Sequence, residues 1–159
     1  MNITLTGFTG TGKTTISRLL AQRLDRKLIS TDEEVKKKIK LSIGKFVNMY
    51  GLEKFREVEC AVIESISDFD ECVFDTSSEV ILRNENLINL KKNGLIILLI
   101  ADIKTILSRI KNNKENLKSL LIEYEHRYKK SADYAIDTSN LSPEEVCDLV
   151  THYVQMELQ

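Results

Sequence analysis

The segment ITLTGFTGTGKTTISRLL, residues 3–20, decides the fold of this chain. It opens with a short β-rich run over residues 3–6, which predicts a buried strand that ends at Gly7. Three glycines and a lysine follow within residues 7–13. From about Thr14 the apolar residues recur at the spacing of an amphipathic helix. The segment is therefore predicted to pass from a strand through a glycine-rich loop into a helix.

Residues 7–14, GFTGTGKT, match the pattern G-x-x-x-x-G-K-[ST] in the strand-to-helix context that the pattern requires. Glycines let the backbone turn tightly, so that its N–H groups point at a phosphate chain beside the positive end of the helix dipole. Lys13 is expected to reach the β- and γ-phosphates, and Thr14 to place its hydroxyl on Mg²⁺. The motif predicts ATP and Mg²⁺ as ligands, bound by Gly7, Gly10, Thr11, Gly12, Lys13, Thr14 and Thr15.

The loop motif alone leaves the reaction open, because small-molecule kinases, GTPases and switch ATPases share it. The sequence contains no N-K-x-D-like motif for guanine, which weighs against a GTPase.

The rest of the chain alternates strands with helices. Further strands are predicted over residues 27–31, 72–75, 95–101 and 134–138. The third of these is apolar throughout, which is typical of the centre of a parallel sheet. Alternation of this kind predicts an α/β fold, a doubly wound parallel sheet of about five strands flanked by helices. Because the chain has one proline and no evident linker or repeat, residues 1–159 are expected to form a single domain. The expected helix N-caps are Ser42, Asn84 and Ser142.

The composition is that of an ordinary globular protein. The 159 residues are 42% hydrophobic and 30% charged, and the formal net charge of -1 gives no reason to expect nucleic acid or an anionic membrane as a partner. The three cysteines have no metal-ligand spacing, and no signal peptide or membrane-spanning run is evident. We therefore expect a cytoplasmic monomer that acts on a small molecule.

Several segments in order along the chain resemble the shikimate kinase family: GFTGTGKTTISRLLAQRL, STDEEV, YGLEKFREVE, LINLKKNGLIILLIAD and ADYAIDTSNLSPEEV. The resemblance implies an α/β nucleotide-kinase-like core, with an acceptor-binding helical region over about residues 32–62 and a short lid over about 111–118. It implies transfer of the γ-phosphoryl group of ATP to the 3-hydroxyl of shikimate, a carboxylated polyol.

The resemblance also implies roles for single residues. Asp32 matches the aspartate that orients the acceptor hydroxyl or helps to remove its proton; the alternative is a helix N-cap. Arg56 matches the arginine that binds the acceptor carboxylate, and Glu59 would support it from the next helical turn. The alternative for these two is a surface ion pair. The residues expected near the adenine are Asp137, Thr138, Ser139, Asn140 and Pro143, with Arg109 or Lys111 on its other face.

Four features depart from the family pattern. Ser30 stands where the family has a carboxylate that helps to hold the Mg²⁺ water shell. Residues 77–79, Ser-Ser-Glu, replace a glycine triplet, so that Glu79 is expected to bring negative charge toward the phosphates. The lid segment lacks the family arginine. Tyr124 replaces a second carboxylate-binding arginine, and Arg127, three residues later, is a substitute candidate for acceptor binding.

Asp75 is a candidate replacement for the missing carboxylate. It ends the apolar run CVFD, which is how parallel sheets present a carboxylate to Mg²⁺. The alternative is an aspartate that caps the following turn.

Three functions remain open from the sequence. The first is phosphorylation of shikimate. The second is the same fold acting on a different small hydroxylated metabolite. The third is a catalytically degenerate nucleotide-binding member of the family. The intact residues Lys13 and Thr14 favour an ATP-dependent phosphotransferase.

Overall fold

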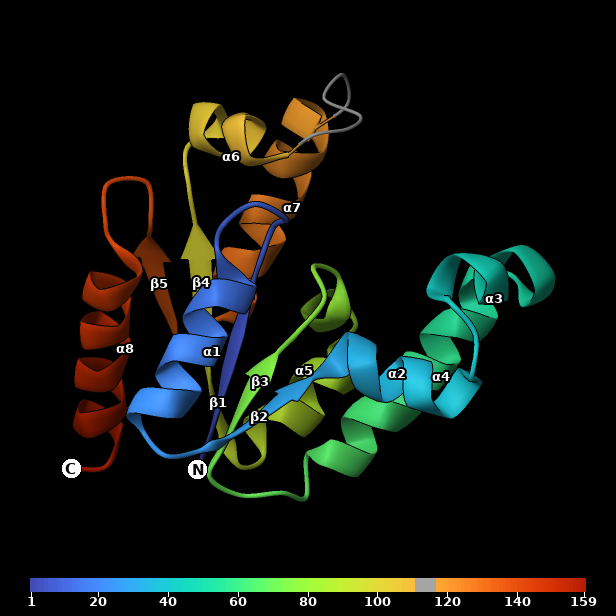
Figure 1. The fold of residues 1–159 in the computed structure, drawn as a ribbon, viewed down its shortest axis with the longest axis horizontal. Helices are drawn as coiled ribbons and strands as arrows, with labels where there is room; N and C mark the ends of the chain where they lie inside the picture. The colour runs from blue at the N-terminus through green and yellow to red at the C-terminus, as the bar shows by residue number, and fades with distance from the viewer. Residues whose placement is uncertain (111–116) are drawn as a thin grey trace.

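The computed structural model describes residues 1–110 and 117–159, which form one five-stranded parallel sheet with helices on both faces (Figure 1). The strands are β1 (Asn2–Gly7), β2 (Lys27–Ser30), β3 (Cys72–Asp75), β4 (Gly94–Ile100) and β5 (Tyr134–Asp137). The helices are α1 (Lys13–Arg23), α2 (Thr31–Ile39), α3 (Ile43–Tyr50), α4 (Leu52–Ile66), α5 (Asn84–Lys91), α6 (Ile103–Arg109), α7 (Leu117–Ser131) and α8 (Pro143–Glu157), with a 3₁₀ turn, η1 (Val80–Leu82). The predicted fold class is confirmed.

The strand order β2-β3-β1-β4-β5 places β1 between β3 and β4. In open α/β sheets, ligands bind beyond the carboxyl ends of the strands, where the strand order reverses. The chain moves to one side of β1 for β2 and β3 and to the other side for β4 and β5. The loop after β1 therefore lies where this topology builds binding sites.

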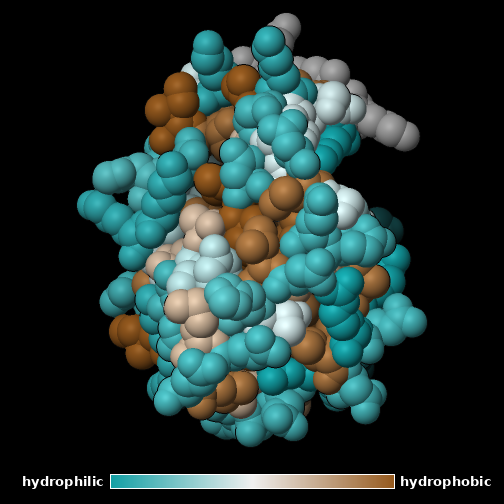
Figure 2. Space-filling view, turned by 90° about the vertical axis from the view of Figure 1, so that its left-hand side faces the viewer, coloured by the Kyte–Doolittle hydropathy of each residue, from teal (hydrophilic) through white to brown (hydrophobic). Residues whose placement is uncertain are grey.

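The two faces of the sheet support separate apolar cores. Residues such as Ile97 and Leu99 of β4 pack with α1 and α8 on one face, while Ile96 and Leu98 pack with α4, α5 and α7 on the other. Because both faces are covered, β4 is apolar throughout, as its sequence predicted. Helices α2, α3 and α4 extend beyond the β2 edge of the sheet (Figure 1). Figure 2 shows the molecule turned by 90° about the vertical axis of Figure 1. Hydrophilic residues cover most of this face, and hydrophobic residues lie in patches between them.

The helix caps follow the sequence in two cases out of three. Ser142 makes a reciprocal capping box with Glu145 at the start of α8, and Ser42 caps α3. The prediction for Asn84 is wrong, because α5 begins at Asn84 itself and Arg83 holds the cap position without a side-chain bond. Ser30 caps α2 by accepting a hydrogen bond from the Glu33 amide.

Candidate functional site

The loop between β1 and α1 has the backbone that its glycines permit. Gly7, Gly10 and Gly12 all have positive φ angles, of 141°, 89° and 93°. A Cβ on Gly7 would lie 2.3 Å from the carbonyl oxygen of Leu99, so only glycine lets β1 leave the sheet here. The Thr11 hydroxyl donates to the Phe8 carbonyl at 2.8 Å and closes the loop from inside.

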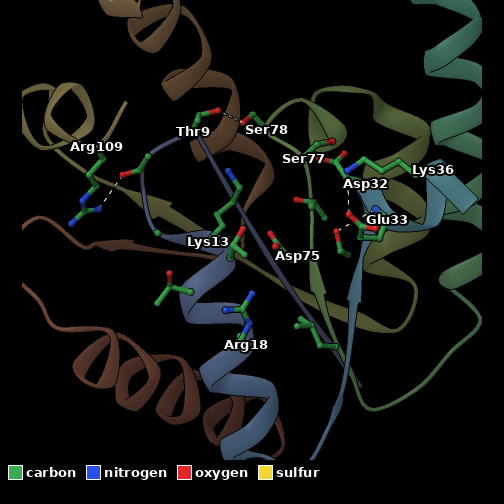
Figure 3. A pocket seen from close by; sticks show the side chains of 17 residues that line it. Thr9, Lys13, Arg18, Asp32, Glu33, Lys36, Asp75, Ser77, Ser78 and Arg109 are labelled. Carbon is green, nitrogen blue, oxygen red and sulfur yellow. Dashed lines mark hydrogen bonds and ion pairs between the residues drawn. The ribbon is translucent and has the colours of Figure 1, made fainter. Parts of the chain in front are cut away.

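This loop forms one wall of a cavity of about 750 Å³ (Figure 3). The other walls come from the carboxyl ends of β2 and β3 and from the first turns of α1 and α2. Lys13 and Asp75 lie at the centre of the view, with Asp32 and Lys36 on one side and Arg109 on the other (Figure 3). The lining residues are Thr9, Gly10, Gly12, Lys13, Thr14, Thr15, Arg18, Leu28, Ser30, Asp32, Glu33, Lys36, Asp75, Thr76, Ser77, Ser78 and Arg109.

Lys13 and Asp75 both line this cavity, and each affects the pKa of the other. Burial lowers the pKa of the Lys13 ammonium to about 8, although the carboxylates of Asp75 and Asp32 act in the opposite direction. Burial also raises the pKa of Asp75, while a hydrogen bond with the Thr14 side chain and the charge of Lys13 lower it. The Lys13 ammonium donates to the Gly7 and Phe8 carbonyls at 2.6 Å and 3.3 Å. It is held at the mouth of the loop, where a phosphate oxygen would be a stronger acceptor.

Thr14 and Asp75 contribute a hydroxyl and a carboxylate to the same cavity. These are oxygen ligands of the kind that Mg²⁺ prefers. Among residues 1–110 and 117–159, no group of three or more His, Cys, Asp or Glu side chains gathers as a ligand set. Thr14 and Asp75 could each offer an oxygen to a Mg²⁺ ion that takes its other ligands from phosphates and water, as is usual for this metal.

Asp32 is a cavity residue and not a helix cap. The α2 cap is Ser30, so the alternative interpretation of Asp32 is wrong. Thr31, between them, accepts a hydrogen bond from the Ser77 amide at 3.2 Å. This contact ties the end of β2 to the loop after β3 and fixes the spacing of the two walls.

Arg56 and Glu59 form a partly buried network beside the cavity. Arg56 Nη1 donates to Glu59 Oε1 at 2.8 Å, and Glu59 Oε2 accepts from the Ser77 hydroxyl at 3.0 Å. Glu59 is only 1% exposed, so the alternative of a surface ion pair is wrong. Since Ser77 lines the cavity, the network reaches its wall.

Glu79 does not direct its charge at the phosphate loop. Its carboxylate accepts a hydrogen bond from Arg56 Nη2, and the Tyr124 hydroxyl lies 3.5 Å from its other oxygen. The expectation that Glu79 would face the phosphates is therefore wrong. The side chains of residues 77–79 instead divide between the cavity wall and Arg56.

A smaller cavity of about 200 Å³ adjoins the loop on the side of β5 and α8. Two of the residues expected near the adenine, Thr138 and Pro143, line it together with Arg109. Arg109 donates to the Gly10 carbonyl at 3.0 Å and lines both cavities. Thr138 donates to the Thr11 carbonyl at 3.1 Å, which joins the β5 loop to the phosphate loop.

Other candidate residues lie elsewhere. Asn140 is exposed and lines neither cavity. Arg127 is exposed and donates to the Leu82 carbonyl at 3.2 Å, so it does not reach the main cavity. Lys111 and most of the expected lid, residues 111–118, lie outside the described residues, which resume with Leu117 at the start of α7.

Sequence reasoning missed two basic cavity residues, Arg18 and Lys36. Both follow a predicted site residue by one helical turn, since Arg18 is four residues after Thr14 and Lys36 is four after Asp32. Helical spacing from the motif residues was the signal that would have found them.

Comparison with known proteins gives a consistent result. Residues 9–155 match the family described as shikimate kinase. A shikimate kinase from Caldicellulosiruptor bescii is 40% identical, over 90% of this chain and 89% of that protein. One from Thermodesulfovibrio yellowstonii is 36% identical, over 94% of this chain and 92% of that protein.

Solved structures resemble the whole chain. The shikimate kinase from Acinetobacter baumannii in complex with shikimate superimposes with a TM-score of 0.89 at 25% identity, over 98% of this chain and 93% of that one. The structure of shikimate kinase from Aquifex aeolicus gives a TM-score of 0.87 at 28% identity, over 99% and 98%. In the described part of this chain, no helix has the length and apolar character needed to cross a membrane.

Proposed function

Because this chain belongs to the shikimate kinase family, we propose that it transfers the γ-phosphoryl group of ATP to a hydroxyl of shikimate. One observation carries the proposal. A single cavity contains the phosphate loop with Lys13, a strand-end carboxylate at Asp75 and a second carboxylate at Asp32. This is the set of groups needed to hold a triphosphate and to present an alcohol to it.

On the donor side, the amides of the phosphate loop and the α1 N-terminus hold the phosphate chain. Lys13 leaves its carbonyl partners, Gly7 and Phe8, and neutralises the charge that develops on the transferred group. Arg18 and Arg109 add positive charge to the same cavity. Arg109 also borders the smaller cavity with Thr138 and Pro143, which we assign to the adenine. Asn140 would reach it only by a change in its loop.

Mg²⁺, when bound, would act as a Lewis acid and withdraw negative charge from the phosphates. We assign its protein contacts to Thr14 and, through water, to Asp75. Two observations support this assignment: both side chains line the main cavity with Lys13, and the Thr14 side chain lowers the pKa of Asp75. Asp75 thereby supplies the carboxylate that Ser30 does not.

On the acceptor side, we assign residues 32–62, which include α3 and most of α2 and α4, to binding of the carboxylated polyol. Asp32 orients the attacking hydroxyl and accepts its proton. Arg56 binds the acceptor carboxylate, and Glu59 holds the guanidinium in place from the buried side. Catalysis then rests on positioning and charge stabilisation, as is usual for phosphoryl transfer.

A different small hydroxylated acceptor is the second candidate. The observation that favours it is the hydrogen bond between Glu79 and Arg56, which gives the guanidinium a carboxylate from its own chain. An uncharged polyol would leave this pair in place.

Steady-state turnover with ATP and a panel of shikimate, quinate and small uncharged polyols separates the candidates. We expect shikimate to give the highest kcat/KM. A higher kcat/KM for an uncharged polyol would favour the second candidate. Absence of turnover with every acceptor, together with tight ATP binding, would leave a nucleotide-binding protein without kinase activity. The cytoplasmic location, the monomeric state and the lid over 111–118 stay predictions.

A further inference from the structure

Arg56 is already bound to two carboxylates of its own chain. Its Nη1 donates to Glu59 and its Nη2 donates to Glu79. Each end of the planar guanidinium fork therefore has an anionic partner, and a third carboxylate can bind in the same way only by replacing one of them.

The two partners differ in how firmly they are held. Glu59 is 1% exposed and also accepts from the Ser77 hydroxyl, so its release would leave a buried charge and a buried donor without partners. The Glu79 side chain is 40% exposed, and its second contact, with the Tyr124 hydroxyl, is long at 3.5 Å. Glu79 can move into water at low cost. It is thus the exchangeable partner of Arg56.

The backbone beside Glu79 is anchored next to the cavity. The Tyr128 hydroxyl donates to the Ser78 carbonyl, and the hydroxyls of Ser78 and Thr9 lie 3.0 Å apart. Figure 3 shows Ser77 and Ser78 on the cavity wall that faces the phosphate loop. Only the Glu79 side chain has to move for the solvent side of Arg56 to become available.

We propose that Glu79 determines acceptor specificity by occupying the site on Arg56 that the acceptor carboxylate must take. This inference rests on the proposed function, in which Arg56 binds that carboxylate. Glu79 acts as a tethered competitor. The apparent affinity for a carboxylated acceptor is reduced by the fraction of molecules in which Glu79 is bound, because only the remainder can bind the acceptor.

The test is the variant Glu79→Gln, which keeps the size of the side chain and removes its charge. We expect KM for shikimate to fall about two- to fivefold, the range for loss of one partly exposed ion pair. KM for ATP should stay the same and kcat should change by less than twofold. The methyl ester of shikimate, which lacks the negative charge, should show no gain.

Glu53→Gln is the matched control, because Glu53 is an exposed carboxylate whose two oxygens each lie 2.9 Å from Arg83 Nη2. It should leave KM for shikimate unchanged. In an Arg56→Ala background, Glu79→Gln should also have no effect on KM, since the competition requires the guanidinium.

The outcomes separate the inference from the proposed function. If the wild type phosphorylates shikimate and Glu79→Gln leaves KM unchanged or raises it, only the inference is overturned. If the wild type is inactive and Glu79→Gln phosphorylates shikimate, the inference stands and the proposed function of the natural chain fails. If neither protein turns over shikimate, both are overturned.

Discussion

Burial and the neighbouring carboxylates shift the pKa of the Lys13 ammonium group in opposite directions. Burial dominates and lowers its pKa from 10.5 to about 8. ATP phosphates favour the charged form, so they raise this pKa in the complex. Well below pH 8 the group is charged in both states and almost no proton moves. Above it the free protein has lost a proton that the complex retains.

We therefore predict that ATP binding takes up close to one proton at pH 9 and almost none from Lys13 at pH 7. Calorimetry in two buffers with different ionisation enthalpies measures this uptake. The control variant Lys13→Met should bind ATP weakly and take up no proton at pH 9. Equal uptake at pH 9 by the variant and the wild type would show that another group titrates.

Asp75 allows a test of the assigned Mg²⁺ contact. Asp75→Asn keeps the shape of the side chain and removes the charge beside Thr14. We expect the Mg²⁺ concentration for half-maximal rate to rise about ten- to a hundredfold, the usual cost of losing a supporting carboxylate near a metal. A Mg²⁺ titration of the rate measures it, with the exposed Asp68→Asn as control. If the variant needs the same Mg²⁺ concentration as the wild type for half-maximal rate, Asp75 has only a structural role.

Arg56 allows a test of the acceptor assignment. Arg56→Ala should raise KM for shikimate about ten- to a hundredfold, since a charge-assisted hydrogen bond contributes about 1.5–3 kcal/mol. Arg56→Lys should recover only part of this, because an ammonium lacks the planar fork. Arg83→Ala, which removes the partner of the exposed Glu53, is the control. Unchanged KM in a folded Arg56→Ala variant, verified by its melting temperature, would exclude Arg56 from acceptor binding.

Among single residues, the sequence predicts those whose role follows from the pattern of their neighbours in the chain. Lys13 and Thr14 come from a contiguous motif, and Asp75 from the end of an apolar strand. The bond between Arg56 and Glu79 was not predictable, because it joins side chains 23 residues apart, on α4 and in the loop after β3, which only the tertiary fold brings together. Arg127 donates to the Leu82 carbonyl and does not line the main cavity, and its role in acceptor binding stays a prediction.

Helix α8 shows how local sequence determines an element boundary. Ser142 accepts from the Glu145 amide at 3.2 Å, Glu145 accepts in return from the Ser142 amide at 2.7 Å, and Pro143 starts the first turn. Loss of such a cap costs about 1 kcal/mol. Because α8 packs against β5 and α1, loss of the cap should lower the free energy of unfolding of the whole domain.

We predict that Ser142→Ala lowers the free energy of unfolding by about 1 kcal/mol, as measured by urea denaturation. Ser65→Ala is the matched control. Ser65 lies on an exposed position within α4, where alanine is the better helix former. Equal stability losses in the two variants would contradict the capping role. Asn84 shows the limit of this reasoning, because the same residue type near a helix start does not cap α5.

The whole molecule depends on β4, which supports both apolar cores. Leu98 is fully buried on the side of α4, α5 and α7, and Leu99 is fully buried on the side of α1 and α8. The apolar run predicted correctly that β4 is an interior strand covered on both faces, although the middle strand of the sheet is β1. The strand order was not predictable from the run alone, because every strand-helix alternation is compatible with several orders.

We predict that Leu98→Ala lowers the free energy of unfolding by about 2–5 kcal/mol, because a cavity remains in the core. Ile88→Ala, at a half-exposed position on α5, should cost less than about 0.5 kcal/mol. Since the chain has no tryptophan, tyrosine fluorescence and circular dichroism are the probes. Two separate transitions in the wild type would contradict a single cooperative unit built on β4.

The most direct test of the account is identification of the product formed from ATP and shikimate. Phosphorus NMR and mass spectrometry of the reaction mixture should detect one shikimate phosphoester for each ADP released, at a rate well above ATP hydrolysis without shikimate. Lys13→Met, which lacks the phosphate-binding ammonium, should form almost none. ADP released at the same rate with and without shikimate, with no phosphoester formed, would contradict the assignment of this cavity to shikimate phosphorylation.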